Sequence, residues 1–246
     1  MLRFLLLVAG ALALALPAQA DVIWRTYALR QSECDSSGLD PQVSIRGCTL
    51  IIRGNNVTGE RRAAAYRRRG DHYRSIDDHD RALQDYSEAI SLNTESGIVY
   101  YRRAELFRAR GDYQAALDDF TNFVRLEPNR IAGYLGRCRT LATMREQLDR
   151  ARADCDAALE RALPEHVHLV HSARGYVGLL EGNFSAAWAD YDAALTLSPM
   201  DANAQYGRGL AARALGRAEE AAQDLAAALR LEADAADGFE AVETAP

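Results

Sequence analysis

Apolar and polar residues follow one another along most of the chain with the spacing of amphipathic helices, and the same arrangement returns at a nearly fixed interval. The segment that begins at Gly111 aligns with the one that begins at Gly182, and each runs through an apolar stripe to a proline, Pro128 or Pro199. Gly216 begins another copy. Two helices in a unit of about 34 residues are typical of a solenoid, in which neighbouring units bury each other's apolar faces. The pattern predicts five helical hairpins, at residues 63–96, 97–130, 131–167, 168–201 and 202–235, the third being longer than the others.

Five positions of the unit keep one kind of residue: a large one at position 4, small ones at 8, 20 and 27, and an aromatic one at 24. Across the hairpins, position 4 is Tyr66, Tyr100, Tyr134, His171 and Gln205; position 8 is Gly70, Ala104, Cys138, Gly175 and Gly209; position 20 is Ala82, Ala116, Ala151, Ala187 and Ala221; position 24 is Tyr86, Phe120, Cys155, Tyr191 and Leu225; position 27 is Ala89, Phe123, Ala158, Ala194 and Ala228. This set resembles the tetratricopeptide repeat family, with departures at Phe123, Gln205 and Leu225. The resemblance implies an all-α fold, a right-handed superhelical solenoid of helix-turn-helix hairpins with an N-terminal half-repeat cap.

The first twenty residues have the pattern of a signal peptide. Arg3 is followed by 13 apolar residues, Phe4 to Leu16, and by an A-x-A cleavage signal that ends at Ala20. Thirteen apolar residues are too few to span a bilayer, and no later segment is apolar enough to do so. We expect a bacterial protein that is secreted across the inner membrane, with a mature chain that begins at Asp21 and resides in the periplasm without a transmembrane segment.

The residues on either side of the hairpins are expected to cap the stack. Within 21–62, the stretch Ser32 to Pro41 has the composition of a loop. Gln42 to Arg53 reads as an amphipathic helix, with Val43, Cys48 and Ile51 or Ile52 toward the first full hairpin. Residues 236–246 form the tail, where we expect a short helical turn around Phe239.

The chain has four cysteines, an even number that suits disulfides in an oxidising compartment. Cys34 and Cys48 bracket the loop before the cap helix. The family resemblance places Cys138 and Cys155 on facing helices of one hairpin. We therefore expect the disulfides Cys34–Cys48 and Cys138–Cys155; the alternative is that Cys138 and Cys155 are reduced core residues.

The net charge of −6 is unevenly distributed, since residues 1–145 have 21 Arg and 17 acidic residues, whereas residues 146–246 have 8 Arg and 18 acidic residues. The absence of lysine fits codon bias in a GC-rich genome or, alternatively, an arginine-specific ligand. Arginine recurs at position 7, as Arg69, Arg103, Arg137, Arg174 and Arg208, and aspartate recurs at position 23, as Asp85, Asp119, Asp154, Asp190 and Asp224. A partly buried arginine needs a carboxylate, so we expect each Arg to pair with an Asp of its own or the preceding repeat. A basic stripe for an acidic ligand is the alternative.

The resemblance also implies where a ligand binds, because related solenoids hold extended peptides in the concave groove formed by the first helix of each hairpin. The candidate groove residues are Arg67, Asp71, Arg74, Tyr101, Glu105, Arg108, Arg139, Tyr176 and Tyr206. This set is rich in arginine at its N-terminal end and more apolar toward the last two hairpins. It favours a protein or peptide partner with an acidic segment. An ordinary solvated helix face is the alternative for the groove. For the protein, the alternative is a structural subunit of a cell-envelope complex that docks through its convex face or C-terminal end.

Other chemistry finds little support in the sequence. No glycine-rich phosphate loop, HExxH or GxSxG motif occurs, so we expect neither an enzyme nor a cofactor. His166, His168 and His171 lie close in sequence, but His171 falls at a core position, so we expect no metal site. The arginines between Arg61 and Arg74 are basic enough for nucleic acid, but the export signal and the acidic C-terminal half argue against it. A membrane surface is the other alternative for this cluster.

Overall fold

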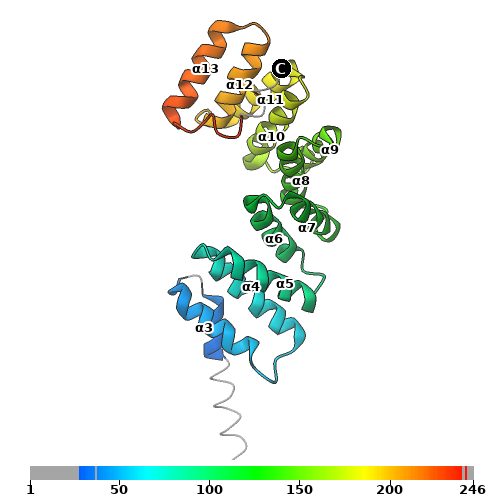
Figure 1. The fold of residues 1–246 in the computed structure, drawn as a ribbon, viewed down its shortest axis with the longest axis vertical. Helices are drawn as coiled ribbons and strands as arrows, with labels where there is room; N and C mark the ends of the chain where they lie inside the picture. The colour runs from blue at the N-terminus through cyan, green and yellow to red at the C-terminus, as the bar shows by residue number, and fades with distance from the viewer. Residues whose placement is uncertain (1–27, 37, 240–241, 243–246) are drawn as a thin grey trace, which may run out of the picture. The chain divides into compact units, whose positions relative to one another are not determined.

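The computed structural model describes residues 28–36, 38–239 and 242, and the expected signal peptide lies outside the described residues. All regular elements in this part of the chain are helices (Figure 1). The chain divides into two compact units, residues 1–99 and 100–246, and the boundary falls within α6 (Gly97–Arg110).

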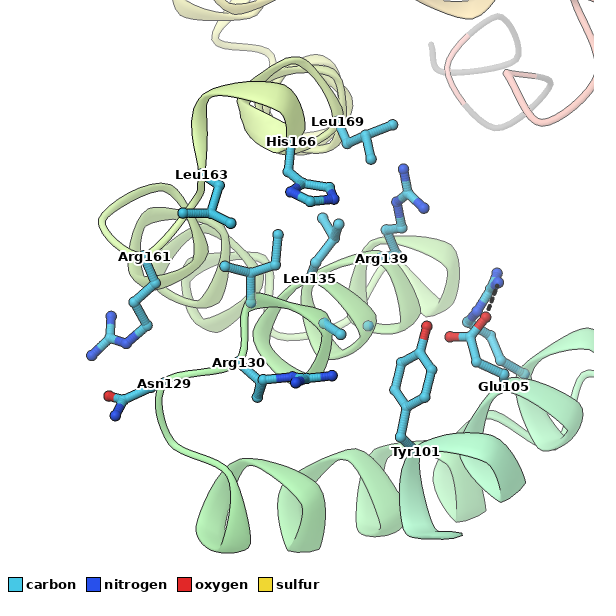
Figure 2. Close-up of a pocket in the computed structure, with 14 residues that line it drawn as sticks. Tyr101, Glu105, Asn129, Arg130, Leu135, Arg139, Arg161, Leu163, His166 and Leu169 are labelled. Atoms are coloured by element: carbon cyan, nitrogen blue, oxygen red, sulfur yellow. Dashed lines mark hydrogen bonds and ion pairs between the residues drawn. The ribbon is translucent and has the colours of Figure 1, made fainter. Parts of the chain in front are cut away.

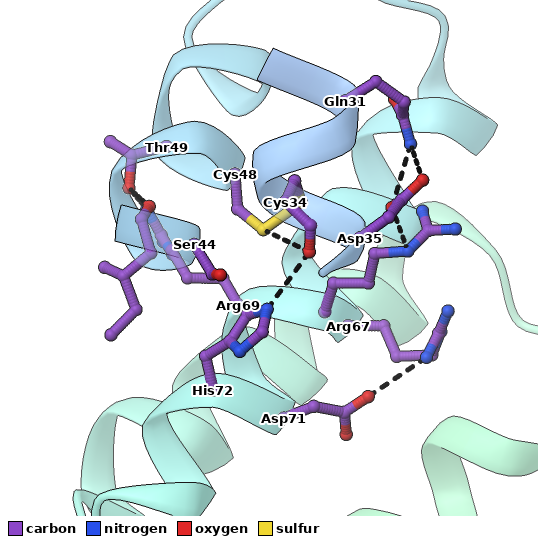
Figure 3. Close-up of a disulfide and its surroundings, with 12 residues drawn as sticks. Gln31, Cys34, Asp35, Ser44, Cys48, Thr49, Arg67, Arg69, Asp71 and His72 are labelled. Atoms are coloured by element: carbon purple, nitrogen blue, oxygen red, sulfur yellow. Dashed lines mark hydrogen bonds and ion pairs between the residues drawn. A yellow bond between two sulfur atoms is a disulfide. The ribbon is translucent and has the colours of Figure 1, made fainter. Parts of the chain in front are cut away.

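The first unit begins, in its described part, with a helical segment at residues 28–35. It continues with α3 (Pro41–Ile52), α4 (Gly59–Ser75) and α5 (His79–Leu92). The loop expected from Ser32 is therefore wrong at its start, because Cys34 lies in a helix and is fully buried. Contacts that composition does not reveal hold this segment (Figure 3): Gln31 donates to the Asp35 carboxylate at 2.8 Å, and Arg68 pairs with the same carboxylate at 2.6 Å.

The cap helix α3 lies where the pattern predicts it, and it buries Cys48 and Ile51 as expected, but its buried face is rotated away from Val43. Ser44, Ile45, Cys48 and Ile51 are buried, whereas Val43, which we expected to face the first hairpin, is only half-buried. The reason is the contact between α3 and the preceding helical segment: a Cβ on Gly47 would lie 2.7 Å from the Cβ of Glu33. This approach and the Cys34–Cys48 bond set the rotation of α3.

The second unit contains the later hairpins. Its helices after α6 are α7 (Tyr113–Leu126), α8 (Ile131–Met144), α9 (Leu148–Leu159), the short 3-10 helix η1 (Pro164–His166), α10 (Val167–Leu180), α11 (Phe184–Leu197), α12 (Ala202–Ala214) and α13 (Ala218–Leu231). Gly111, Gly182 and Gly216 have positive φ in the turns within hairpins. In the longer third hairpin, Arg145 and Gln147 have positive φ instead.

Helices of successive hairpins approach closely because one presents a glycine where the other presents a ring. A Cβ on Gly136 would lie 2.5 Å from a ring carbon of Phe120, and one on Gly207 would lie 2.2 Å from Cζ of Tyr191. Both rings are almost fully buried. Phe123, which departs from the family pattern, fits by the same device, because a Cβ on Gly133 would lie 2.8 Å from its ring.

Both expected cysteine pairs lie at bonding distance in the structure. Cys34 is joined to Cys48 and Cys138 to Cys155, with Cα–Cα distances of 4.6 and 5.5 Å. The first bond ties the helical segment at residues 28–35 to α3 (Figure 3). The second joins α8 to α9 at the positions that hold a small residue and an aromatic residue in most other hairpins.

Each arginine at position 7 pairs with the aspartate at position 23 of its own hairpin. In three of these pairs two guanidinium nitrogens meet the two carboxylate oxygens at 2.7 to 2.8 Å: Arg69 with Asp85, Arg103 with Asp119, and Arg208 with Asp224. Arg137 pairs with Asp154 and Arg174 with Asp190. The expected pairing is therefore present in all five hairpins.

Three of these arginines also reach the preceding hairpin or the cap. Nη1 of Arg174 donates to Asp156 and Nη1 of Arg208 to Asp192, both at 2.7 Å, while Nη1 of Arg69 donates to Thr49 at 2.9 Å. Asp156 and Asp192 stand two residues after the position-23 aspartate, at a position that we did not single out. The arginines at position 7 therefore also connect successive hairpins.

We call the five pairs between position 7 and position 23 the arginine–aspartate ladder. In each pair the carboxylate is more buried than the guanidinium group. The Asp119 side chain is 5% exposed, against 19% for Arg103. Burial raises the pKa of Asp119, although the hydrogen bonds from Arg103 oppose the shift. Asp154 behaves in the same way, since burial raises its pKa against Arg137. Each arginine thus offsets much of the cost of a desolvated carboxylate.

Peptide mapping without reduction should recover Cys34 linked to Cys48 and Cys138 linked to Cys155. Replacing Cys138 and Cys155 together with serine should lower the free energy of unfolding by about 3 kcal/mol, as expected for a loop of this length. Free thiols at all four positions would refute both bonds.

Gly207→Ala should lower the free energy of unfolding by about 1–3 kcal/mol, because the added methyl group overlaps the Tyr191 ring. Chemical denaturation measures the loss. Gly59→Ala in α4 is the control, since its added Cβ meets no atom within 4 Å. Equal effects of the two substitutions would show that space beside Tyr191 is not limiting.

Arg103→Leu should destabilise the chain by about 3–5 kcal/mol, because it leaves the Asp119 carboxylate buried without a cation. Changing Asp119 to leucine as well should restore most of the loss. Arg110→Leu serves as the control in the same helix, because Arg110 is 57% exposed and its pair with Asp112 should contribute less than about 1 kcal/mol. A double-mutant cycle in urea tests this, and additive effects would count against a direct pair.

Candidate functional site

A cavity of about 490 Å³ opens among the first helices of the second unit (Figure 2). Its walls come from α6, α8, α10 and the connections between α7 and α8 and between α9 and α10. We call this cavity the arginine pocket. It is lined by Tyr101, Glu105, Arg108, Asn129, Arg130, Ile131, Ala132, Leu135, Gly136, Arg139, Arg161, Leu163, His166 and Leu169.

One part of the arginine pocket is apolar. Leu135, Leu163 and Leu169 lie toward one side in Figure 2, and Tyr101 extends from α6 on the other side. The Tyr101 ring packs on Phe123, with ring centroids 5.2 Å apart, and this contact fixes its direction. Burial raises the pKa of Tyr101, so the phenol stays protonated and can donate a hydrogen bond.

The polar lining of the pocket is strongly cationic, with four arginines and one histidine against one glutamate. Two of the arginines are already engaged. Arg108 pairs with Glu105 at 3.2 Å, and Arg161 donates to the backbone oxygen of Ala157 at 2.7 Å. Arg161 also lies over the ring of Tyr134, 4.8 Å from its centroid.

The other two arginines, Arg130 and Arg139, form no ion pair with any described residue. Arg139 remains accessible to water, yet it lies in a recess beside Arg108. Burial lowers the pKa of Arg139, and the like charge of Arg108 lowers it further. The guanidinium stays charged at neutral pH, so an anion placed between the two arginines would relieve an unfavourable interaction.

A second cavity of about 400 Å³ shares Arg108 and Arg139 with the arginine pocket. Its other walls include Tyr176, Tyr191 and the C-terminal residues 237–239. We call it the aromatic pocket. Phe239 meets Tyr176 edge to face, with centroids 5.6 Å apart, and lies 5.3 Å from the ring of Tyr206.

The sequence-predicted groove residues therefore fall into three groups. Tyr101, Glu105, Arg108 and Arg139 come together at the arginine pocket. Tyr176 and Tyr206 contact the chain's own Phe239. The remaining three, Arg67, Asp71 and Arg74, lie in the first unit.

In the first unit, Arg67 pairs with Asp71 at 3.1 Å. Asp71 also accepts a hydrogen bond from the Tyr86 hydroxyl at 2.8 Å, whereas Arg74 is exposed at the end of α4. Arg67 lines a small cavity of about 140 Å³ with residues from α4, α5 and the connection to α6. The positive charge of Arg67 is thus largely compensated by Asp71 within α4.

Sequence reasoning missed Arg130, Arg161 and His166 as pocket residues. All three lie in the connections between helices, whereas our candidates came from helix positions implied by the family resemblance. One signal was available: the third hairpin is longer before the fourth begins, and this extra length contains Arg161 and His166.

Within the histidine motif, one side chain has a clear partner in its own hairpin. His171 turns to Asp190, with Nδ1 2.9 Å from the carboxylate, so it joins the arginine–aspartate ladder. Across the described residues, no group of three or more His, Cys, Asp or Glu is placed to hold a metal ion. In the same part of the chain no helix is both long and apolar enough to cross a bilayer.

Comparison with known proteins agrees with the helical hairpins. A family model described as tetratricopeptide repeat matches residues 173–238. No curated protein matches the chain at a significant level.

Several solved structures share the fold at low sequence identity. YrrB, described as a TPR protein with an unusual peptide-binding site, is 21% identical, with 80% of this chain and 96% of that chain covered and a TM-score of 0.61. MamA from Desulfovibrio magneticus RS-1 is 17% identical, with coverages of 70% and 96% and a TM-score of 0.63. A tetratricopeptide repeat protein from Parabacteroides merdae is 18% identical, with coverages of 88% and 85% and a TM-score of 0.64.

The family match is confined to the last hairpins, but the residues at positions 8, 20 and 24 have the same packing role in the earlier ones. The solved structures extend the fold over most of the chain. Residues 173–238 thus match the tetratricopeptide repeat family, and over most of the chain the fold is that of solved tetratricopeptide repeat structures.

Proposed function

We propose that this protein is an exported, non-catalytic scaffold that binds an acidic segment of a protein or peptide partner at the arginine pocket. The observation that carries the proposal is the pair Arg130 and Arg139, which line one cavity and have no ion-pair partner among the described residues. The hairpin fold supports the broader role, since solenoids of this kind present extended surfaces to other proteins.

The shape and charge of the pocket suit a carboxylate that is carried on a chain. An arginine guanidinium binds a carboxylate through two parallel hydrogen bonds, and Tyr101 offers a further donor. The leucines beside these groups suit an apolar side chain next to the acid. A segment that alternates acidic and apolar residues would use both parts of the lining.

A peptide is favoured over a small metabolite for two reasons. The two pockets adjoin at Arg108 and Arg139, so the recess continues past a single binding site. The related fold of YrrB has a peptide-binding site according to its description. Among the described residues that line the arginine pocket, Glu105 has the only carboxylate, and it pairs with Arg108, which supports a binding role over acid–base catalysis.

Both cysteine pairs support the oxidising compartment. Disulfides persist in the periplasm and are rare in the cytosol. The signal-peptide pattern supports export across the inner membrane. It consists of Arg3, the apolar run Phe4 to Leu16 and the A-x-A signal that ends at Ala20. We therefore place the partner in the bacterial cell envelope.

The alternative is a structural subunit that docks through its convex face or C-terminal end. Exposed apolar side chains near the C-terminal end favour it: Leu197 is 53% exposed, Met200 70% and Leu229 46%. Crosslinking in intact cells separates the two functions. A stoichiometric partner crosslinked at residues 202–246 supports docking, whereas a partner at Arg139 supports the pocket.

Arg139→Ala should weaken the binding of a fluorescein-labelled, glutamate-rich peptide by about tenfold, equivalent to about 1.4 kcal/mol. The reason is the loss of an uncompensated positive charge at the pocket. Fluorescence anisotropy of the full chain measures the change, and binding should also weaken as salt is raised.

The matched control is Arg125→Ala, which removes the same charge from an exposed site on α7 and should leave binding unchanged. Equal losses in the two variants would show that net charge, and not the pocket, attracts the peptide. Tighter binding of a lysine-rich peptide would contradict the proposal directly.

A further inference from the structure

The chain after α13 turns back toward the helices that form the groove. α13 ends at Leu231, and residues 233–238 form successive turns. Backbone hydrogen bonds between residues three apart shape these turns: Asp237 N donates to Asp234 O at 2.9 Å, and Phe239 N donates to Ala236 O at 3.0 Å. Phe239 is buried at the end of this path, with 6% of its surface exposed.

Phe239 lies against two of the candidate groove residues, at the more apolar end of that set. It packs on Tyr176 from α10 and Tyr206 from α12. The Tyr191 hydroxyl belongs to the same aromatic pocket, is fully buried and has no hydrogen-bond partner in the described structure. A buried hydroxyl without a partner costs free energy, and a bound backbone could satisfy it.

The returning segment also brings a negative charge to the pocket that Arg108 and Arg139 line. Asp237 lines the aromatic pocket together with Arg108 and Arg139. It is exposed and forms no ion pair with the described residues, so its carboxylate shares a pocket with the arginines without being fixed to them. The sequence Asp237-Gly238-Phe239 thus combines an acidic and an aromatic side chain, the chemistry that the two pockets together favour.

We propose that Asp237-Gly238-Phe239 is an internal occupant of the groove, and that the partner's segment displaces it with an aromatic residue of its own placed close to an acidic one. This inference rests on the proposed function, because it assumes that the acidic part of the partner binds at the arginine pocket. It narrows the partner from an acidic segment to an acidic segment with an aromatic anchor.

A permanently docked segment would use its polar side chains differently. Asp237 would be expected to pair with an arginine. In the structure Asp237 forms no ion pair with the described residues, and the segment packs on the core of the second unit through apolar side chains, those of Phe239 and Ala235 among them. An apolar attachment without an ion pair is compatible with exchange.

The test uses fluorescence anisotropy with the full chain and two labelled peptides, Glu-Glu-Asp-Gly-Phe-Glu and its twin with alanine in place of phenylalanine. Phe239→Ala should bind the phenylalanine peptide roughly tenfold more tightly than the wild type does, as when an occupant fills the site about nine-tenths of the time. Affinity for the alanine twin should not change. Leu229→Ala is the control, because it removes an apolar side chain that is 46% exposed on α13 and lies outside the aromatic pocket.

An unchanged or weaker affinity of Phe239→Ala for the phenylalanine peptide would overturn the inference, while binding that still depends on Arg139 would leave the proposed function intact. If neither acidic peptide binds any variant, the proposed function fails. In that case the site occupied by Phe239 is tested separately. A labelled peptide of residues 233–246 should bind the Phe239→Ala chain and not the wild type. No binding to either chain overturns the inference as well.

Hydrogen exchange on the wild-type chain gives a readout that does not depend on the folding of a variant. The Phe239 amide, which donates to Ala236 O, should exchange faster when the phenylalanine peptide is present at saturation. Unchanged or slower exchange would show that the peptide does not displace the segment.

Discussion

The close contact between helices of successive hairpins is the constraint on which the rest of the structure depends. Where Gly136 meets Phe120 and Gly207 meets Tyr191, a single methyl group has no room. A contact this tight fixes how the helices cross, and the crossing decides which residues face the neighbouring hairpin and which face the groove. The positions that line the arginine pocket on α6 and α8 follow from this geometry. Their side chains could change without altering the contact itself.

Charge in this chain separates into a structural set and a set available to a ligand. The arginines of the ladder are held by buried aspartates, and some of them also reach a neighbouring hairpin or the cap. Arg130 and Arg139 have no such partner among the described residues and line a cavity. The composition counts all of these residues alike. Whether an arginine has an ion-pair partner within the chain therefore says more about ligand binding than the net charge of the chain does.

Much of the fold could be predicted from the sequence, because it depends on residues that recur. The hairpins, the arginine–aspartate pairs and the Cys138–Cys155 pair all follow from position within the repeat. The structure differs where a single contact outweighs local composition. Cys34 lies in a helix because Asp35 is held by Arg68 and Gln31.

The pocket was harder to predict for a related reason. Arg130, Arg161 and His166 belong to connections, which the repeat pattern does not constrain. The place of Phe239 in the groove depends on how the chain turns after α13, and a single sequence gives only local signals for that turn. In both cases the missing information concerns long-range packing of irregular segments.

Three consecutive residues of α8 serve three separate purposes. Arg137 belongs to the ladder, Cys138 to the disulfide and Arg139 to the pocket. Successive side chains on an α-helix point about 100° apart, so each of the three faces a different neighbour. Mutation at Arg139 can therefore change what the protein recognises at little cost to folding, while its two neighbours are constrained by the core. Within one helical turn, the residue that can vary, Arg139, is thus distinct from the residues that folding requires, Arg137 and Cys138.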